Sequence, residues 1–391
     1  MSTSDIDGLL QGAVDGRVIP GVVALTGDRD GAQYEGAFGL LNIDGGAAVE
    51  ADTMFAIMSM TKAFVSVAAL QLIEQGSLEL SQPVADILPA FADLQVLEGF
   101  DGDTPRLRAP ARQATIRNLL THTSGLAYSF LNRDILRYRE VTGTPLETSG
   151  QLATLQAPLV ADPGTRWEYG ISTDWLGQVI EAVSGSDLAT YCAEHIFEPL
   201  GMTDATFRPS DEQVARMMAL HFRAPDGGLV QNSLELPEPE FWMGGSGAYA
   251  TGPDYLRFLR ALLRDGELDG ERVLRAETVE LALSDHLDGA PLPDGMVSAM
   301  PELSNDVPAF PFLQGWGLGF HLFLEDLPAM RRAGSADWGG LFNCSYWIDR
   351  ASGVVGVFLT QVLPFYDARI VETAAGFELG VYADVGALHS A

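Results

Sequence analysis

One stretch, residues 53–76 (TMFAIMSMTKAFVSVAALQLIEQG), constrains this chain more than any other. It contains the motif Ser59-x-x-Lys62, followed by a run over residues 63–73 in which only a serine and a glutamine are polar. A helix that is apolar around most of its circumference packs inside a protein rather than on its surface. The sequence therefore predicts an interior helix with a serine at its mouth and a lysine one turn further in.

The spacing of Ser59 and Lys62 favours nucleophilic catalysis. Residues three apart share one face of a helix, so the lysine amine can reach the serine hydroxyl. A serine hydroxyl is a weak nucleophile unless a base takes its proton. Burial and a positive helix N-terminus both disfavour an ammonium, which lowers the pKa of a lysine in this position. Lys62 is therefore a candidate general base for Ser59 near neutral pH.

Composition strengthens this motif, which is weak by itself. Lys62 is the only lysine in the chain, and the other 22 basic residues are arginine. Arginine does not deprotonate in proteins and cannot act as a base in that position. The alternative is a structural lysine that extends its charge along the helix to water.

Charge and leader features exclude several classes of function. The net charge of −30 repels nucleic acid and anionic membranes, so neither is expected as a partner. The N-terminal residues lack a basic and apolar leader, and no run of 18 apolar residues exists, which predicts a cytoplasmic protein. Cys192 and Cys344 are too few for a disulfide framework and are expected to be reduced, buried thiols. No histidine pair has metal-ligand spacing, so we expect neither a metal nor another cofactor.

The order of elements predicts an α+β fold. Expected strands lie at both ends of the chain, and the middle is mostly helical. The expected elements are a helix over 5–16, strands over 21–26, 32–41, 315–324, 330–333, 343–349 and 354–361, and a helix over 368–382. Residues 93–114 are expected to form an excursion, and 286–312 a surface loop. We therefore expect one catalytic unit over 1–391. It consists of an antiparallel sheet that is built from both termini and flanked by helices (1–76 and 312–391), and of an inserted helical lobe (77–311). The site is expected in a cleft between the two.

Three motifs in order carry a family resemblance: Ser59-x-x-Lys62, Tyr169-Gly170-Ile171 and Trp338-Gly339-Gly340. Further matches are LLTHTSGL at 119–126, Pro163-Gly164, and EPLGM at 198–202. Together they resemble the serine β-lactamase and penicillin-binding-protein superfamily, and most nearly the class C β-lactamase-like esterases called family VIII carboxylesterases. The resemblance spans nearly the whole chain and implies a β-lactamase/transpeptidase-like fold.

The resemblance also implies roles for individual residues. Ser59 would be the acylated nucleophile and Lys62 its proton acceptor. Tyr169, as a phenolate or as a proton relay near Lys62, would assist deprotonation and later activate the deacylating water. The oxyanion hole would consist of the backbone N–H groups of Ser59 and Leu341, because donors aimed at a developing charge supply a large share of catalysis.

Two departures from the family pattern bear on the substrate. Ile171 stands where class C β-lactamases have an asparagine, and Trp338-Gly339-Gly340 stands where they have Lys-Thr-Gly. The lysine and threonine hold a β-lactam carboxylate, and losing two such contacts costs several kcal/mol, at roughly 1.5–3 kcal/mol for each charge-assisted bond. We therefore expect Trp338, Gly339 and Gly340 to form an apolar substrate-binding rim, with weak or absent action on penicillins and a preference for neutral acyl esters.

Three further residues belong to these motifs or follow them closely. His122 is expected to be structural, because Lys62 already fills the role of base. Tyr128 and Asp174 are candidate pocket residues that follow the His122 loop and the tyrosine motif. An alternative for Asp174 is to cap a helix that begins near Trp175.

The leading hypothesis is a serine carboxylesterase that takes a small ester and releases the acyl group to water or to another alcohol. The nearest rival is an amide hydrolase on the same fold: a D-aminopeptidase, an amide-oligomer hydrolase or a weak β-lactamase. A rival of another class is a non-catalytic, penicillin-binding-like sensor, against which the complete set of Ser59, Lys62 and Tyr169 argues. The sequence does not indicate the oligomeric state.

Overall fold

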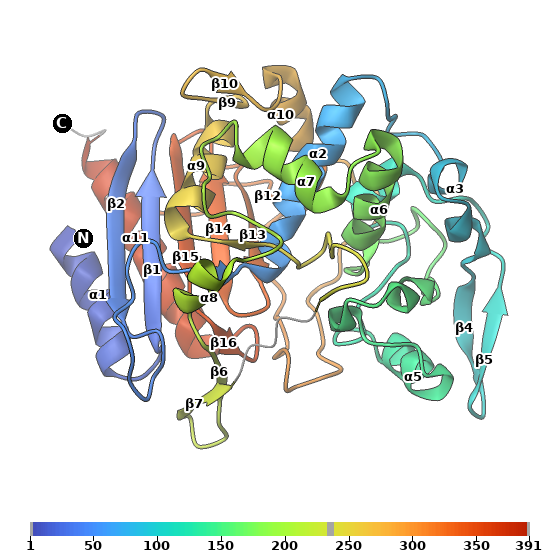
Figure 1. The fold of residues 1–391 in the computed structure, drawn as a ribbon, viewed down its shortest axis with the longest axis horizontal. Coiled ribbons are helices and arrows are strands. Elements are labelled where there is room, and N and C mark those ends of the chain that lie inside the picture. The colour runs from blue at the N-terminus through green and yellow to red at the C-terminus, as the bar shows by residue number, and fades with distance from the viewer. Residues whose placement is uncertain (1–2, 233–237, 389–391) are drawn as a thin grey trace.

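A seven-stranded antiparallel sheet forms the centre of the computed structural model, which describes residues 3–232 and 238–388. Within the sheet β15 pairs with β1 from the N-terminal end and with β14 from the C-terminal end, so both ends of the chain build one sheet (Figure 1). In sheet order the strands are β11 (Gln314–Trp316), β12 (His321–Phe323), β13 (Ala336–Gly340), β14 (Cys344–Asp349), β15 (Val354–Leu359), β1 (Gly21–Gly27) and β2 (Ala32–Gly39). The predicted α+β fold is confirmed.

Helices cover both faces of this sheet. On one face lie α1 (Thr3–Asp15) and α11 (Ala368–Leu388), and on the other lie α2 (Thr61–Glu74) and α9 (Gly252–Leu263). Successive side chains of a strand point to opposite faces. Accordingly Trp347 of β14 packs against Phe377 of α11, with 5.7 Å between ring centroids, while the adjacent Tyr346 packs against Tyr255 of α9 at 5.4 Å.

The interior helix predicted from residues 53–76 is present as α2. All residues from Thr61 to Leu72 are buried, because sheet, α9 and the neighbouring helices surround it. Phe64 contacts Phe197 and Phe258 edge-on at 5.0 and 4.7 Å between ring centroids. A helix enclosed on all sides holds its first turn rigidly, which is what a catalytic serine needs.

The remaining helices and strands are mostly short. The helices are α3 (Val84–Ile87), α4 (Ile116–Leu120), α5 (Arg133–Thr142), α6 (Ser172–Ser184), α7 (Leu188–Cys192), α8 (Asp211–Ala215) and α10 (Ala276–Ala282). The short strands are β3 (Phe55–Ala56) with β8 (Tyr249–Ala250), β4 (Val96–Asp101) with β5 (Thr104–Arg108), β9 (Glu267–Leu268) with β10 (Glu271–Arg272), and β16 (Val362–Leu363) with β6 (Leu220–Arg223) and β7 (Leu229–Asn232). The exact lobe boundaries stay a prediction, and α9 packs on the sheet although it lies within 77–311.

Two predictions of strands were wrong. Residues 315–324 form two antiparallel strands, because the chain reverses over 317–320, where Gly319 has a φ of +95°. Residues 330–333 form no strand, and the strand begins instead at Ala336, so that it contains Trp338-Gly339-Gly340. The excursion predicted at 93–114 contains the β4–β5 hairpin.

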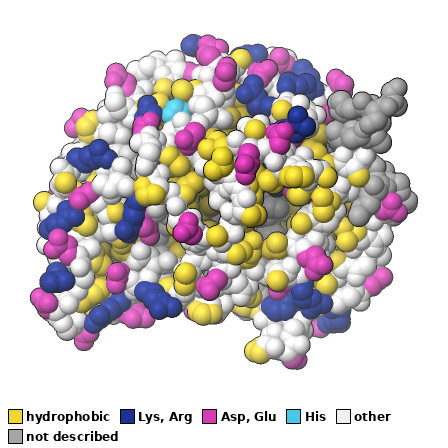
Figure 2. Space-filling view, turned by 180° about the vertical axis from the view of Figure 1, so that it is seen from behind, with side chains coloured by type: hydrophobic (Ala, Val, Ile, Leu, Met, Phe, Trp, Pro, Cys, Tyr) yellow, Lys and Arg dark blue, Asp and Glu magenta, His cyan; other side chains and the backbone are white. Residues whose placement is uncertain are grey.

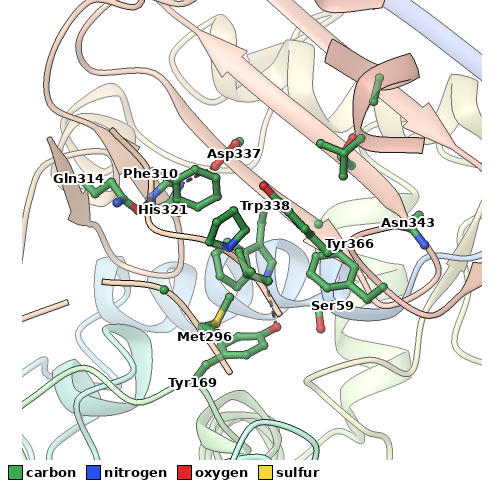
Figure 3. A pocket seen from close by; sticks show the side chains of 18 of the residues that line it. Ser59, Tyr169, Met296, Phe310, Gln314, His321, Asp337, Trp338, Asn343 and Tyr366 are labelled. Carbon is green, nitrogen blue, oxygen red and sulfur yellow. Dashed lines mark hydrogen bonds and ion pairs between the residues drawn. The ribbon is translucent and has the colours of Figure 1, made fainter. Parts of the chain in front are cut away.

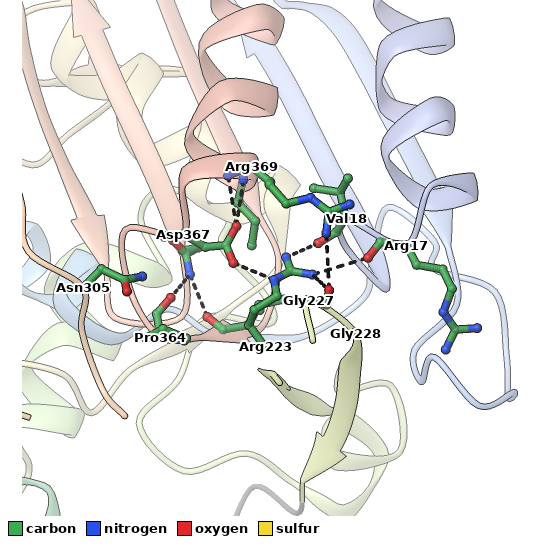
Figure 4. A network of polar contacts seen from close by, with 12 residues as sticks. Arg17, Val18, Arg223, Gly227, Gly228, Asn305, Pro364, Asp367 and Arg369 are labelled. Atoms are coloured by element: carbon green, nitrogen blue, oxygen red, sulfur yellow. Dashed lines mark hydrogen bonds and ion pairs between the residues drawn. The ribbon is translucent and has the colours of Figure 1, made fainter. Parts of the chain in front are cut away.

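An arginine network joins the two ends of the chain near the base of the sheet (Figure 4). Arg223 of β6 donates to the Asp367 carboxylate at 2.7 Å and to the Val18 carbonyl at 2.6 Å. Asp367 in turn accepts from the backbone N–H of Arg369, in the first turn of α11. The network fixes where α11 starts relative to α1.

Over the described residues, no helix combines the length and the apolar character needed to cross a membrane.

Candidate active site

Ser59 lies in a short 3-10 turn, Met58–Met60, that runs directly into α2. Its hydroxyl is 3.0 Å from the Lys62 Nζ atom, so the contact predicted from their spacing is present. Ser59 is partly exposed, whereas Lys62 is only 2% exposed. Met58, just before the serine, has a φ of +49°, a backbone strain of the kind found at functional sites.

Lys62 Nζ has three polar neighbours. Besides Ser59 Oγ, it contacts the Tyr128 hydroxyl at 3.0 Å and the Gly245 carbonyl at 2.8 Å. A neutral amine has two hydrogens and one lone pair. The two hydrogens of a neutral Lys62 can be donated to the Gly245 carbonyl and the Tyr128 hydroxyl, which both accept hydrogen bonds. The lone pair of the amine then faces Ser59.

Burial sets the protonation of Lys62 and of its neighbour Asp174. Burial lowers the pKa of Lys62 to about 7, although the charge of Asp174 acts in the opposite direction. Burial likewise raises the pKa of Asp174 to about 6, opposed by Lys62 and by the Gly245 N–H, which donates to the carboxylate at 3.0 Å. A neutral lysine beside an ionised aspartate is thus accessible near neutral pH.

Tyr169 connects Lys62 to the strand β13. Its ring centroid is 4.8 Å from Lys62 Nζ, and its hydroxyl accepts a hydrogen bond of 2.9 Å from the Trp338 indole N–H. Burial raises the pKa of Tyr169 above its usual value, while Ser59 and Trp338 act in the opposite direction through hydrogen bonds. Figure 3 shows the Tyr169 hydroxyl directed toward Trp338, with Ser59 beside them.

The end of β13 lies against the turn that carries Ser59. A Cβ atom at Gly340 would be 2.4 Å from the Ile57 carbonyl oxygen and 3.3 Å from the Met58 Cβ, so only glycine allows this approach. Leu341 follows immediately, and both Ser59 and Leu341 line the same cavity. The backbone of Leu341 is therefore suitably placed for the oxyanion site that the resemblance implied, a role that stays a prediction.

A cavity of about 310 Å³ opens at Ser59. Tyr169, Trp338 and Gly339 also line it, and so does the segment 286–312, which was expected to be only a surface loop. That segment contributes the apolar side chains Leu292, Pro293, Met296, Val307, Pro308 and Phe310. Hydrophobic side chains gather around a hollow in the face shown in Figure 2. Such a site suits an apolar substrate.

The structure brings the predicted residues together in two layers. Ser59, Tyr169, Trp338 and Gly339 line the cavity, whereas Tyr128 and Asp174 are not among its lining residues and lie behind Lys62. The alternative that Asp174 caps a helix was wrong: α6 begins at Ser172 with no side-chain cap.

The sequence did not predict the contacts of Gly245 or the hydrogen bond that Trp338 donates to Tyr169. Gly245 was not among the predicted site residues, yet it contacts both Lys62 and Asp174 through its backbone. A Cβ at this position would be 2.6 Å from the Tyr128 hydroxyl and 2.7 Å from Asp174 Oδ2. Three glycines among four residues, at 244–247, were the available signal for such close approach.

His122 lies beside Tyr169 within an aromatic cluster. The His122 ring packs against Tyr169 and Trp316 at 5.1 and 5.2 Å between ring centroids, and burial lowers its pKa well below the usual value. A neutral ring within an aromatic cluster agrees with the structural role expected for it. Cys192 and Cys344 are free and buried, as predicted.

Comparisons with known proteins agree with this geometry. A model of the Beta-lactamase family matches residues 6–380. A monacolin J acid methylbutanoyltransferase from Aspergillus terreus is 34% identical over 393 residues, covering 95% of this chain and 93% of the relative. A lovastatin esterase from Penicillium rubens is 31% identical over 400 residues, covering 96% of this chain and 98% of the relative.

A solved structure is also similar to this chain. A mutant of simvastatin synthase from Aspergillus terreus superimposes with a TM-score of 0.85 at 31% identity, covering 98% of this chain and 97% of that one. A transferase and an esterase are thus similar to this chain in sequence, and a synthase is similar to it in fold.

Proposed function

The chain belongs to the Beta-lactamase family and is a serine hydrolase or acyltransferase with the β-lactamase fold; from that premise we propose that it is a carboxylesterase acting through an acyl-enzyme on Ser59. The observation that carries the proposal is the distance of 3.0 Å between Lys62 Nζ and Ser59 Oγ, with a lysine pKa lowered to about 7. A nucleophile paired with a base that is neutral at working pH is the minimum apparatus for acyl transfer.

In the proposed first step Lys62 accepts the hydroxyl proton as Ser59 Oγ attacks the ester carbonyl. The backbone N–H groups of Ser59 and Leu341 stabilise the oxyanion. Tyr169, whose hydroxyl accepts from Trp338, passes a proton to the departing alcohol. Water then repeats the sequence on the acyl-enzyme, with Lys62 and Tyr169 in the reverse roles.

Transfer to an alcohol in place of water is the second candidate. It is supported by the apolar lining of the cavity beside Ser59 and by the transferase among the relatives. A dry, apolar site slows hydrolysis of the acyl-enzyme relative to its capture by an apolar alcohol. The same acyl-enzyme serves both outcomes, so the two candidates differ only in the acceptor.

The proposal is tested with p-nitrophenyl butyrate and the matched butyryl p-nitroanilide. We expect steady turnover of the ester, slower turnover of the anilide, and a butyryl group mapped to Ser59 in protein quenched during turnover. An added alcohol would reveal transfer as a butyrate ester of that alcohol. Faster cleavage of the anilide would instead support the amide hydrolase, and a single labelling event without turnover would support the sensor.

Tyr169→Phe is expected to lower kcat for the butyrate ester by about 10²-fold or more, since it removes one proton-transfer group. It also leaves the indole N–H of the partly buried Trp338 without its acceptor. The matched control is Tyr191→Phe, a buried tyrosine on α7 that does not line the cavity. Activity near wild type in Tyr169→Phe would mean that Lys62 performs both proton transfers alone.

Gly245→Ala is expected to lower kcat by about 10²-fold, because the new methyl group displaces Tyr128, Asp174 or the carbonyl that holds Lys62. The control is Gly31→Ala, where an added Cβ meets nothing within 4 Å. Both variants are compared by steady-state kinetics and by thermal unfolding. An unchanged kcat in Gly245→Ala would show that the position of Lys62 does not depend on this contact.

A further inference from the structure

The cavity that opens at Ser59 continues past Trp338 onto the other face of the sheet. Beyond β13 it is lined by Gly339 and Ser345 and by the first turns of α11, including Ala374 and Ala375. Trp338 and Asp337 leave β13 on opposite sides, so the cavity passes the edge of the strand (Figure 3). We call the part lined by Gly339, Ser345 and Ala374 the α11 groove.

Small side chains account for the α11 groove. Gly339 and Ser345 are direct partners across β13 and β14, and neither fills the space beneath α11. Further along the same helix the rings of Trp347 and Phe358, which also line the cavity, pack against Phe377. Ala374 and Ala375 remain partly exposed although they line the cavity. Small side chains thus leave room beneath α11 in the segment that leads to Ser59.

The far part of the same cavity is polar. Arg331 donates to both oxygens of the Glu378 carboxylate, at 2.6 and 2.8 Å, and also to Asp337. His321 contacts the second oxygen of Asp337 at 2.6 Å. One guanidinium thus faces two carboxylates, whose remaining lone pairs can accept further hydrogen bonds. This polar end of the cavity therefore favours a ligand group that donates a hydrogen bond over a ligand carboxylate.

We propose that the α11 groove is a binding subsite for the larger arm of the substrate, an extended apolar chain whose far end carries a hydroxyl or another donor that reaches Asp337 and Glu378. The inference that this chain is part of a substrate rests on the proposed function, whereas the groove can bind such a chain whether or not Ser59 reacts. It adds a substrate class to the site: an amphiphilic ester rather than a short one alone.

Binding is measured without chemistry, in a Ser59→Ala background, with decane-1,10-diol as the probe and calorimetry or tryptophan fluorescence as the readout. Ala374→Phe fills the groove and is expected to raise Kd by about tenfold or more. The control is Ala368→Phe, on the same helix but exposed and outside the cavity, which is expected to leave Kd unchanged. Equal Kd values in the two variants would overturn the proposal.

Two comparisons separate the parts of the proposal. Decane-1,10-diol is expected to bind more tightly than decan-1-ol, and decanedioate more weakly than either; tighter binding of decanedioate would overturn the polar end. In the active protein, Ala374→Phe is expected to lower kcat/KM for decyl butyrate or p-nitrophenyl decanoate by a larger factor than kcat/KM for p-nitrophenyl butyrate. If the diol binds as expected but no ester turns over, the proposed function fails and the groove stands. If esters turn over but Ala374→Phe leaves the Kd for the diol unchanged, the proposed function stands and the groove fails.

Discussion

Ser59→Ala is expected to lower kcat/KM for p-nitrophenyl butyrate by about 10⁵-fold, to the rate of the uncatalysed background, because removing a nucleophile eliminates the covalent route. The change deletes one oxygen from a partly exposed side chain, and its contact with Lys62 Nζ at 3.0 Å is the hydrogen bond that is lost. Thermal unfolding is expected to change little. The measurement is the initial rate at equal enzyme concentration.

The matched control for Ser59→Ala is Ser66→Ala. Ser66 is also a serine of this interior segment, is 1% exposed, and does not line the cavity. We expect Ser66→Ala to keep its activity even if it loses some stability. Equal rates in wild type and Ser59→Ala would contradict the acyl-enzyme on this serine, whatever the behaviour of Ser66→Ala.

The parts of the site that were predictable depend on short sequence separations. The α2 helix and the contact between Ser59 and Lys62 follow from periodicity and from a spacing of three residues. The low pKa of Lys62 also followed, because a helix that apolar must be buried and burial disfavours an ammonium. The family resemblance then added Tyr169 and the end of β13, which lie far away along the chain.

The parts that were not predictable depend on tertiary approach. Trp338 was expected to make the rim apolar, yet its indole N–H donates to the Tyr169 hydroxyl, which supplies a donor where the family's lysine would have stood. Gly245 comes close to Lys62 only because the chain at 244–247 folds back over α6. The boundaries of β11 to β13 were misjudged because glycines and aromatics in 315–340 fit either strands or turns until the partner strands are known.

Lys62→Met is expected to lower kcat/KM by about 10³-fold, because methionine has similar length but cannot accept a proton. Lys62→Arg is expected to be equally impaired, since arginine retains a charge but does not deprotonate. If Lys62→Arg kept substantial activity, the lysine would be acting through its charge rather than as a base. Thermal unfolding of both variants checks that the loss is not one of folding.

The same role for Lys62 predicts the pH dependence. The base is active only when neutral, so kcat/KM is expected to rise with pH through about 7, the pKa to which burial lowers this lysine. The Asp174 charge raises the lysine pKa, so Asp174→Asn should shift the midpoint to lower pH. A profile that falls, or is flat, between pH 6 and 8 would contradict a lysine base.

The chain offers a direct measurement, because Lys62 is its only lysine. Protein labelled with ¹³C at the lysine ε-carbon has a single such NMR signal, and its titration gives the lysine pKa without reference to activity. We expect a midpoint near 7 in wild type and a lower one in Asp174→Asn. A midpoint at the ordinary value of about 10.4 would leave Lys62 charged at neutral pH and would exclude it as the base. Agreement between this midpoint and the kinetic one would identify the same proton in both experiments.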